Sequence, residues 1–238
     1  MDLNCDLGEG AGHDAALMPL ITSANIACGA HAGDLATMRE TVALAQRHGV
    51  AIGAHPGFPN RENFGRRELA LTPEEIRATV RGQIELLLTL SPIRHVKPHG
   101  ALYNMAARDP VIAEAFTFAV HEINPALIVF APAHSELSRA ALSRGLRVAN
   151  EVFADRTYRS DGSLTPRSES GALIHDEHAA VAQVLRMIRE GRVRATDGTD
   201  VAIEAGTVCL HGDGPSPVKF ARRLRAELAT AGVEICAP

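Results

Sequence analysis

The sequence predicts an α/β fold, a single (β/α) barrel, on three observations. Short apolar segments that suit strands alternate with longer segments of helical periodicity, which is the repeat of a parallel sheet. No linker or low-complexity segment interrupts this alternation over the 238 residues. The strand segments are largely apolar, as expected when helices cover one side and a packed interior the other. We therefore expect residues 1–238 to form one domain, an irregular TIM-like barrel with seven strands. An open doubly wound sheet is the second choice.

Each element follows from a local pattern. Apolar runs that end at polar residues or turns predict strands at residues 2–6, 23–28, 50–54, 94–97, 127–130, 148–153 and 207–210. A short eighth strand is expected at residues 233–236. Helical spacing of apolar residues predicts helices at residues 14–20, 35–48, 73–88, 110–123, 135–143, 176–189 and 217–231. Asp197-Gly198 lies in the middle of residues 193–203 and predicts a small β-hairpin there.

Two helix ends carry especially clear signals. Thr72 precedes the third helix as its N-cap, Pro73 suits the first helical position, and Glu75 completes a capping box. Gly49 follows the helix at residues 35–48 and predicts its end, because glycine adopts the left-handed conformation that closes a helix.

Composition and charge exclude several classes of protein. The chain is 46% hydrophobic and 22% charged, with a net charge of −4, so nothing favours a nucleic-acid or anionic-membrane partner. No apolar run is long enough to span a bilayer, and residues 1–6 lack the features of a signal peptide. The four cysteines are scattered and form no CxxC pair, which indicates reduced thiols in a cytoplasmic protein.

Titratable residues gather where the predicted strands end. In barrel enzymes the reacting groups lie at the C-terminal ends of the strands. Five of the eleven histidines fall within a few residues after a predicted strand, which packing alone does not explain. The residues at these positions are Asp6, His31, Asp34, His55, Lys97, His99, His134, Asp155, Arg156, His211 and Asp213. This pattern predicts an active site at that end of the barrel.

Two interpretations remain open for the first group of these residues. Asp6, His31 and His55 offer a carboxylate and two imidazoles, a donor set that suits zinc and similar ions. The alternative is a hydrogen-bonded polar cluster that only orients a substrate.

Lys97 and the turn that begins at His211 suit anionic ligands. Lys97 carries a compact charge with three donors and suits an electrophilic or phosphate-binding role; the alternative is a structural ion pair. The turn lies between a strand and a helix start, where backbone N–H groups and the helix dipole favour an anion. We therefore predict substrate or phosphate binding by His211, Gly212, Asp213 and Gly214.

A long polar loop follows the strand at residues 148–153. It contains Asp155 and Arg156, and Tyr158 and Leu164 give it apolar anchors. Loops of this length in a compact domain are functional or disordered, and the anchors favour function.

Six segments, taken in order, resemble the motifs of one family. They are residues 2–9, 23–34, 53–59 with 64–67, 97–104, 151–167 and 211–215. Together they span essentially the whole chain and resemble the LamB/YcsF family, the A subunit of the bacterial ATP-dependent 5-oxoprolinase. The resemblance implies an irregular barrel similar to polysaccharide deacetylases, in a cytoplasmic complex with two companion subunits, B and C. Ala30 and the loop at residues 9–13 depart from the family pattern, which has aromatic residues there, and we expect a different pocket shape.

The resemblance also implies a reaction. It is the conversion of 5-oxo-L-proline to L-glutamate with hydrolysis of ATP, which brings Mg²⁺ with it, to ADP and phosphate. Lys97, Arg156 and the 211–214 turn would hold phosphate, and His31 would contact substrate. The base that activates water would be one of Asp6, His55, His99 and Asp155.

Two other functions stay open. One is a metal-dependent amidase or deacetylase that works without ATP. The other is a non-catalytic subunit that presents substrate to its partners. The sequence also leaves open a homo-oligomer and the half-reaction that takes place on this chain.

Overall fold

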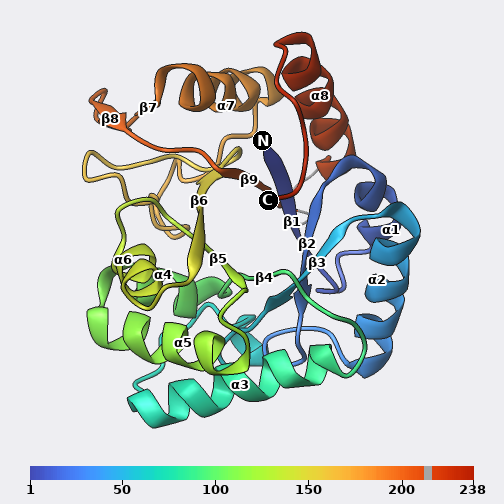
Figure 1. The fold of residues 1–238 in the computed structure, drawn as a ribbon. Coiled ribbons are helices and arrows are strands. Elements are labelled where there is room, and N and C mark those ends of the chain that lie inside the picture. The colour runs from blue at the N-terminus through green and yellow to red at the C-terminus, as the bar shows by residue number, and fades with distance from the viewer. Residues whose placement is uncertain (212–215) are drawn as a thin grey trace.

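The computed structural model describes residues 1–211 and 216–238. Within these ranges seven parallel strands close into a barrel that helices surround (Figure 1). The strand order is β1-β2-β3-β4-β5-β6-β9, which confirms the irregular seven-stranded barrel predicted from the sequence. The strands are β1 (Asp2–Leu7), β2 (Ser23–Ala27), β3 (Ala51–His55), β4 (His95–Val96), β5 (Ile128–Ala131), β6 (Arg147–Phe153) and β9 (Thr207–Leu210).

Strand β9 closes the barrel. Its first residue, Thr207, pairs with Glu151 of β6 on one side and with Asp2 of β1 on the other. Because β9 already lies beside β1, the barrel has no gap for a further strand.

The eighth strand expected near the C-terminal end was therefore wrong. The structure has no strand in the described residues 216–238. Instead, the backbone N–H of Cys236 donates to the carbonyl of Met1 at 3.0 Å, and the Met1 amino group donates to the carbonyl of Glu234 at 2.6 Å. This segment contacts the start of β1 without joining the barrel.

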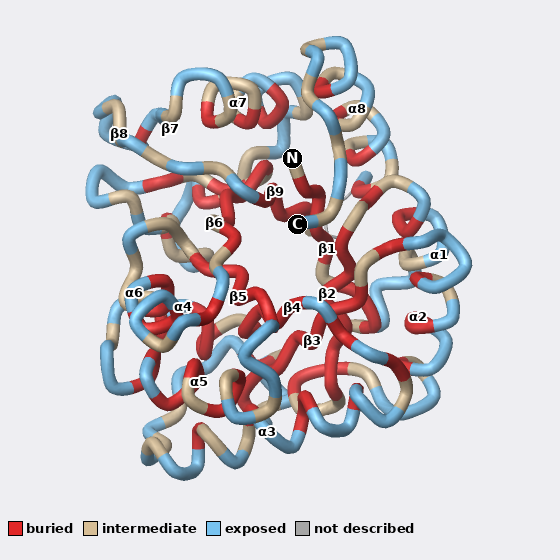
Figure 2. The backbone as a smooth tube through the Cα atoms, in the orientation of Figure 1, coloured by how far each residue is buried: buried red, intermediate tan, exposed pale blue. Residues whose placement is uncertain are grey.

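The helices form the outer layer. They are α1 (Asp14–Leu17), α2 (Leu35–His48), α3 (Pro73–Leu88), α4 (Gly100–Arg108), α5 (Pro110–Ile123), α6 (Glu136–Ser143), α7 (Glu177–Glu190) and α8 (Pro217–Thr230), with 3-10 turns η1 (Met18–Leu20) and η2 (Arg61–Asn63). The strands are buried and the outward faces of the helices are exposed (Figure 2). Among the described residues, none of these helices combines the length and the apolar character needed to cross a membrane.

The local signals read from the sequence are present. Thr72 and Glu75 form the complete capping box of α3, and Gly49 ends α2 in the left-handed conformation. The predicted hairpin is the two-stranded sheet of β7 (Arg192–Arg194) and β8 (Asp200–Ala202). Helix α4 was missed, because glycine begins it and no N-cap side chain marks its start.

The barrel lumen is polar, which corrects the expectation of largely apolar strands. Asn4 of β1 contacts Glu151 of β6 at 3.0 Å and Lys97 after β4 at 3.3 Å, so its side chain crosses the lumen. Every second residue of β1 is polar for this reason. The buried polar residues that line the lumen are Asp2, Asn4, Ser23, Asn25, His95, Lys97, Glu151 and Thr207. Hydrogen bonds among them support the residues at the C-terminal ends of the strands.

Gly53 of β3 makes room for one of these lumen residues. A Cβ atom at Gly53 would lie 2.1 Å from Nε2 of His95, which stacks on Phe130 and contacts Asn25 Oδ1 at 2.9 Å. The substitution Gly53→Ala is therefore expected to lower the free energy of unfolding by about 3 kcal/mol, because the ring has no space to retreat. Urea unfolding measures this change.

A double variant tests the cause. Gly53→Ala combined with His95→Ala removes the clash, so the two losses are expected to be strongly non-additive. Gly82→Ala in the exposed part of α3 is the control, since a Cβ there meets nothing within 4 Å. Additive losses in the double variant would show that His95 does not cause the strain.

Candidate active site

Lys97 lies at the centre of a buried ionic cluster at the C-terminal ends of the strands. Its Nζ atom lies 2.9 Å from Asp6 Oδ1, 2.8 Å from Glu151 Oε1 and 3.3 Å from Asn4 Oδ1. Cys209 Sγ lies 3.0 Å from the same nitrogen, so four acceptors share the three N–H donors of the ammonium group. Burial disfavours the charged amine, but the carboxylates, Asp6 first, outweigh it and hold the pKa of Lys97 well above its usual value. Lys97 is therefore a fixed positive charge.

Asp6 links this lysine to the histidines. Its Oδ1 atom accepts from Lys97 and, at 2.8 Å, from the side-chain amide of Asn25. Its Oδ2 atom lies 3.3 Å from Nε2 of His55. Burial raises the pKa of Asp6, but the charges of His55 and Lys97 more than offset this effect, and the pKa lies well below the ordinary value. Asp6 is held as a carboxylate.

Three histidines and Glu9 form a second group beside Asp6. Glu9 Oε1 lies 3.1 Å from His31 Nε2, 3.2 Å from His99 Nδ1 and 3.7 Å from His55 Nε2. The rings of His31 and His99 are stacked, with centroids 3.7 Å apart and planes within 3°. The ring of His55 is perpendicular to both. Burial lowers the pKa of His31 to about 4, so this ring is neutral.

Backbone carbonyls fix the orientation of two of these rings. His55 Nδ1 lies 2.8 Å from the Lys97 carbonyl oxygen, and His99 Nε2 lies 2.9 Å from the Phe64 carbonyl oxygen. A carbonyl only accepts, so both of these nitrogens carry hydrogen. Phe64 adopts a positive φ of 52°, an unusual conformation for a bulky residue, and thereby aims its carbonyl at His99. The opposite nitrogens, His55 Nε2 and His99 Nδ1, face each other at 2.9 Å.

Gly65 lets the chain approach this histidine stack closely. Its φ is +62°, and a Cβ atom there would lie 2.7 Å from His31 Cβ and 3.0 Å from His99 Cδ2. The segment after β3 thus covers the imidazoles in a way that only glycine permits.

Asp155 and His211 form a dyad at the ends of β6 and β9. His211 Nδ1 donates to the Asp155 carboxylate, whose oxygens lie 2.8 Å and 2.9 Å away. A ring nitrogen of His211 also lies within 4.8 Å of ligand atoms of Asp6 and Cys209, so the dyad adjoins the ionic cluster. The dyad borders a cavity of about 260 Å³ lined by Arg167, His175, Phe220 and other residues.

The substitution Asp155→Asn is expected to flatten the acid limb of the stability profile. Burial raises the pKa of Asp155, but His211, with a smaller contribution from Arg167, lowers it below its ordinary value. A lowered folded-state pKa stabilises the protein above the unfolded pKa, and this stabilisation is lost as the pH falls from about 5 through the folded pKa. Urea unfolding from pH 6 to pH 3 measures the slope, which a structurally idle Asp155 would leave unchanged in the variant.

Comparison with known proteins identifies the family of this chain. The sequence profile of the LamB/YcsF family matches residues 1–238. The chain belongs to the LamB/YcsF family. It is 56% identical over 247 residues to the 5-oxoprolinase A subunit of Geobacillus kaustophilus (strain HTA426), a match that covers 100% of this chain and 96% of that relative.

Two solved structures are similar to this chain. The crystal structure of the lactam utilization protein from Thermus thermophilus is 46% identical, with a TM-score of 0.94, and covers 100% of this LamB/YcsF chain and 99% of that chain. The structure of T48 deacetylase with substrate has a TM-score of 0.51 at 15% identity, over 98% of this chain and 85% of that chain. The second similarity concerns the fold alone.

Most of the residues predicted for the site of this LamB/YcsF chain do converge. Asp6, His55, Lys97 and His99 lie in one connected cluster, His31 joins it through Glu9, and Asp155 with His211 borders it. Gly212, Asp213 and Gly214 lie outside the described residues. Of the three candidate metal ligands, His31 and His55 lie close to Glu9 and His99. The carboxylate of Asp6 lies close to Cys209 and His211 instead.

Arg156 takes a structural position. It is buried, and its guanidinium donates to the carbonyls of Ala172 and Thr165, so it organises the loop after β6. Its predicted contact with phosphate remains a prediction.

The pattern of polar residues at the strand ends did not identify Glu9, Glu151 and Asn4 as site residues. Glu9 lies beyond the strand end that was considered, and Glu151 lies within β6. The alternation of Asp2, Asn4 and Asp6 along β1 was the signal that could have revealed a polar lumen.

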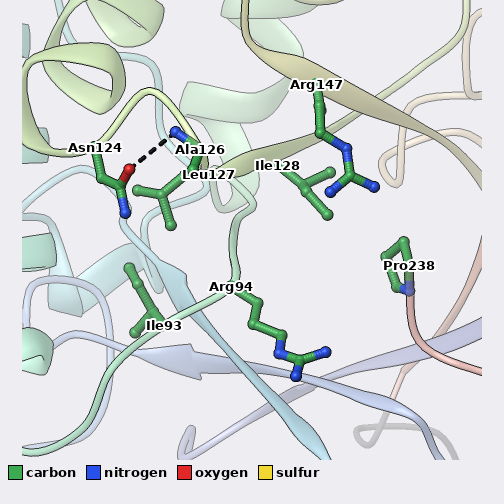
Figure 3. Close-up of a pocket in the computed structure, with 8 residues that line it drawn as sticks. All are labelled: Ile93, Arg94, Asn124, Ala126, Leu127, Ile128, Arg147 and Pro238. Carbon is green, nitrogen blue, oxygen red and sulfur yellow. Dashed lines mark hydrogen bonds between the residues drawn. The ribbon is translucent and has the colours of Figure 1, made fainter.

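A second hollow lies at the opposite end of the barrel (Figure 3). It is lined by residues at or before the starts of β4, β5 and β6, including Arg94, Ile128 and Arg147, and by Pro238. This end of a barrel usually contributes to stability rather than to catalysis.

Proposed function

We propose that this chain is the A subunit of an ATP-dependent 5-oxoprolinase, which opens 5-oxo-L-proline to L-glutamate. The observation that carries the proposal is the 56% identity, over the whole chain, to a protein named as a 5-oxoprolinase A subunit. The buried Lys97–Asp6 cluster beside the Asp155–His211 dyad supports it, because fixed charges next to a base suit acyl chemistry.

The reaction that we propose has three steps. The lactam carbonyl oxygen attacks the γ-phosphorus of ATP, and ADP leaves. A water molecule then adds to the activated carbon while a base takes its proton, and the C–N bond breaks as the nitrogen gains a proton, which gives glutamyl phosphate. A second water molecule hydrolyses this acyl phosphate to glutamate and phosphate. The first step is needed because a lactam amide is a poor electrophile.

His211 is the best-placed base among the described residues. Its Nδ1–H donates to Asp155, so in the neutral ring the lone pair lies on Nε2, ready to accept a proton from water. Lys97 and Asp6 supply fixed charges beside it. Arg167 brings a positive charge to the bordering cavity, which suits the carboxylate of 5-oxoproline or a phosphate group.

ATP is a cosubstrate in this proposal and brings Mg²⁺ with its phosphates. The carboxylate of Asp155 is an oxygen donor of the type that Mg²⁺ prefers, and it lines the same cavity as Arg167. The proposal includes the two companion subunits, B and C, and a cytoplasmic location where ATP is available.

The test is glutamate release from 5-oxoproline by this chain, alone and with both companion subunits, with and without MgATP. We expect turnover only in the complete mixture with ATP, with equal amounts of ADP and glutamate. Turnover without ATP that a chelator abolishes would instead identify a metal-dependent amidase. Full turnover by the companion subunits without this chain would show that it is not needed for catalysis.

A further inference from the structure

Three possible metal-ligand atoms converge in the histidine group beside Glu9. His55 and His99 both direct an N–H at a backbone carbonyl, at 2.8 Å and 2.9 Å. Their other nitrogens, His55 Nε2 and His99 Nδ1, face each other 2.9 Å apart, close enough to bind one ion together. Glu9 Oε1 lies 3.2 Å from His99 Nδ1 and is also an acceptor. Three possible ligand atoms thus lie within reach of one ion.

We propose that Glu9, His55 and His99 bind a divalent transition-metal ion. This proposal goes beyond the proposed function and does not depend on it. The donors are two imidazoles and one carboxylate, which Zn²⁺ and related first-row ions accept at sites that keep a position open. Mg²⁺, which prefers oxygen donors, does not suit this set, so the site differs from the one for MgATP.

The distances among the donor atoms fit such an ion. They are 2.9 Å from His55 Nε2 to His99 Nδ1, 3.2 Å from His99 Nδ1 to Glu9 Oε1 and 3.7 Å from His55 Nε2 to Glu9 Oε1. Donors bound to zinc at its usual bond lengths lie about 3.3 Å apart in a tetrahedral site. The three atoms therefore occupy three corners of a coordination shell without large movement.

The contacts on the far side of each ring are also those of metal ligands. A histidine that binds a metal nearly always donates its other N–H to a carbonyl or carboxylate, which fixes the tautomer. The carbonyls of Lys97 and Phe64 do this for His55 and His99.

The charge of the cluster also favours a bound cation. In the described part of the cluster, the carboxylates of Asp6, Glu9 and Glu151 face one lysine, Lys97. Buried carboxylates require nearby positive charge. A protonated His55 supplies part of it beside Asp6, and a divalent cation bound beside Glu9 would take over that role when the His55 ring is a neutral ligand.

His31 is a positioning residue rather than a ligand. Its ring is parallel to that of His99 with centroids 3.7 Å apart, so the in-plane lone pairs of the two rings cannot meet at one point. Its Nδ1 atom has no hydrogen-bond partner in the described structure, which fits a neutral ring with its proton on Nε2. That proton is donated to Glu9 Oε1 at 3.1 Å and orients the carboxylate.

The first experiment measures metal content. The full chain, expressed without a histidine tag, is stripped with a chelator, incubated with Zn²⁺ and freed of excess metal by gel filtration. We expect about one Zn²⁺ per chain by mass spectrometry, and visible absorption from a four- or five-coordinate ion after loading with Co²⁺. Zinc below about a tenth of an equivalent would overturn the proposal.

Variants then locate the site. Glu9→Gln, at a partly exposed position, keeps the shape of the side chain and is expected to weaken Zn²⁺ binding more than about 100-fold. His134→Ala removes an exposed histidine near the same barrel end and is expected to bind as the wild type does. Equal binding by the wild type and the folded Glu9→Gln variant would overturn the proposal.

The role of His31 has its own test. His31→Asn removes the donor to Glu9 and is expected to weaken Zn²⁺ binding by about 10-fold to 100-fold. His31→Gln places an amide N–H near the former Nε2 position and is expected to restore most of the affinity. If both variants bind Zn²⁺ like the wild type, His31 does not position the site.

Discussion

Replacing Lys97 by methionine is expected to abolish turnover of 5-oxoproline and to lower the free energy of unfolding by about 3–5 kcal/mol. The side chains have similar length, but methionine carries no charge. Asp6 and Glu151, which lie 2.9 Å and 2.8 Å from the ammonium group, would then lose the positive charge that they share. Glutamate release by the complete mixture measures the first effect, and urea unfolding the second.

A double variant separates the two effects. Glu151→Gln added to Lys97→Met removes one of the stranded charges, so we expect much of the stability to return while turnover stays absent. Lys219→Met is the matched control, since the sequence has only these two lysines and the side chain of Lys219 is 76% exposed. Normal turnover by the folded double variant would show that Lys97 is only structural.

The fold could be predicted because its signals are local. The capping box at Thr72 and the glycine at the end of α2 each depend on a few neighbouring residues, and both are present. Helix α4 escaped notice because its buried residues, such as Leu102 and Tyr103, follow a glycine and precede Asp109-Pro110 without a recognisable start. The 233–236 segment resembles a strand in composition, but barrel closure by β9 decides its place.

The site could be predicted only in part, for a related reason. The rule that chemistry gathers at strand ends found Asp6, Lys97 and the histidines, since it needs only the strand boundaries. The partners of Lys97 are set by the closed barrel, which brings Glu151, 54 positions along the chain from Lys97, to 2.8 Å from its ammonium group. Nothing in the local sequence marks that acid as a partner.

The polar lumen connects these two observations. Asn4 donates to Glu151 and accepts from Lys97, while Asn25 donates to Asp6, so the strands themselves hold the ionic cluster in position. Such fixed groups stabilise developing charge without reorganising during the reaction. Because the buried charges of this core must all be paired, single substitutions there are expected to cause large losses of stability.

Asp6→Asn is expected to reduce kcat by about 10²-fold to 10⁴-fold while leaving the fold intact. Its carboxylate bridges Lys97 and His55, and the amide retains the shape but removes the charge and one acceptor. Because Glu151 still pairs with Lys97, the loss of stability is expected to be smaller than for Lys97→Met. Steady-state kinetics with 5-oxoproline and MgATP measure kcat and KM separately, and we expect the change in kcat to dominate.

Asp2→Asn provides the matched control for this prediction. Asp2 lies on the same strand and the same lumen face as Asp6, and it accepts hydrogen bonds from Ser23 at 2.8 Å and from Thr207 at 2.5 Å. It lies at the other end of β1 and is linked to the ionic cluster through the hydrogen bonds of Thr207 and Asn4. Its substitution should therefore lower stability and reduce kcat much less than Asp6→Asn does. Equal losses of kcat in the two variants would mean that Asp6 acts through the lumen network, and a change in kcat of less than about tenfold for Asp6→Asn would exclude a direct role in the reaction.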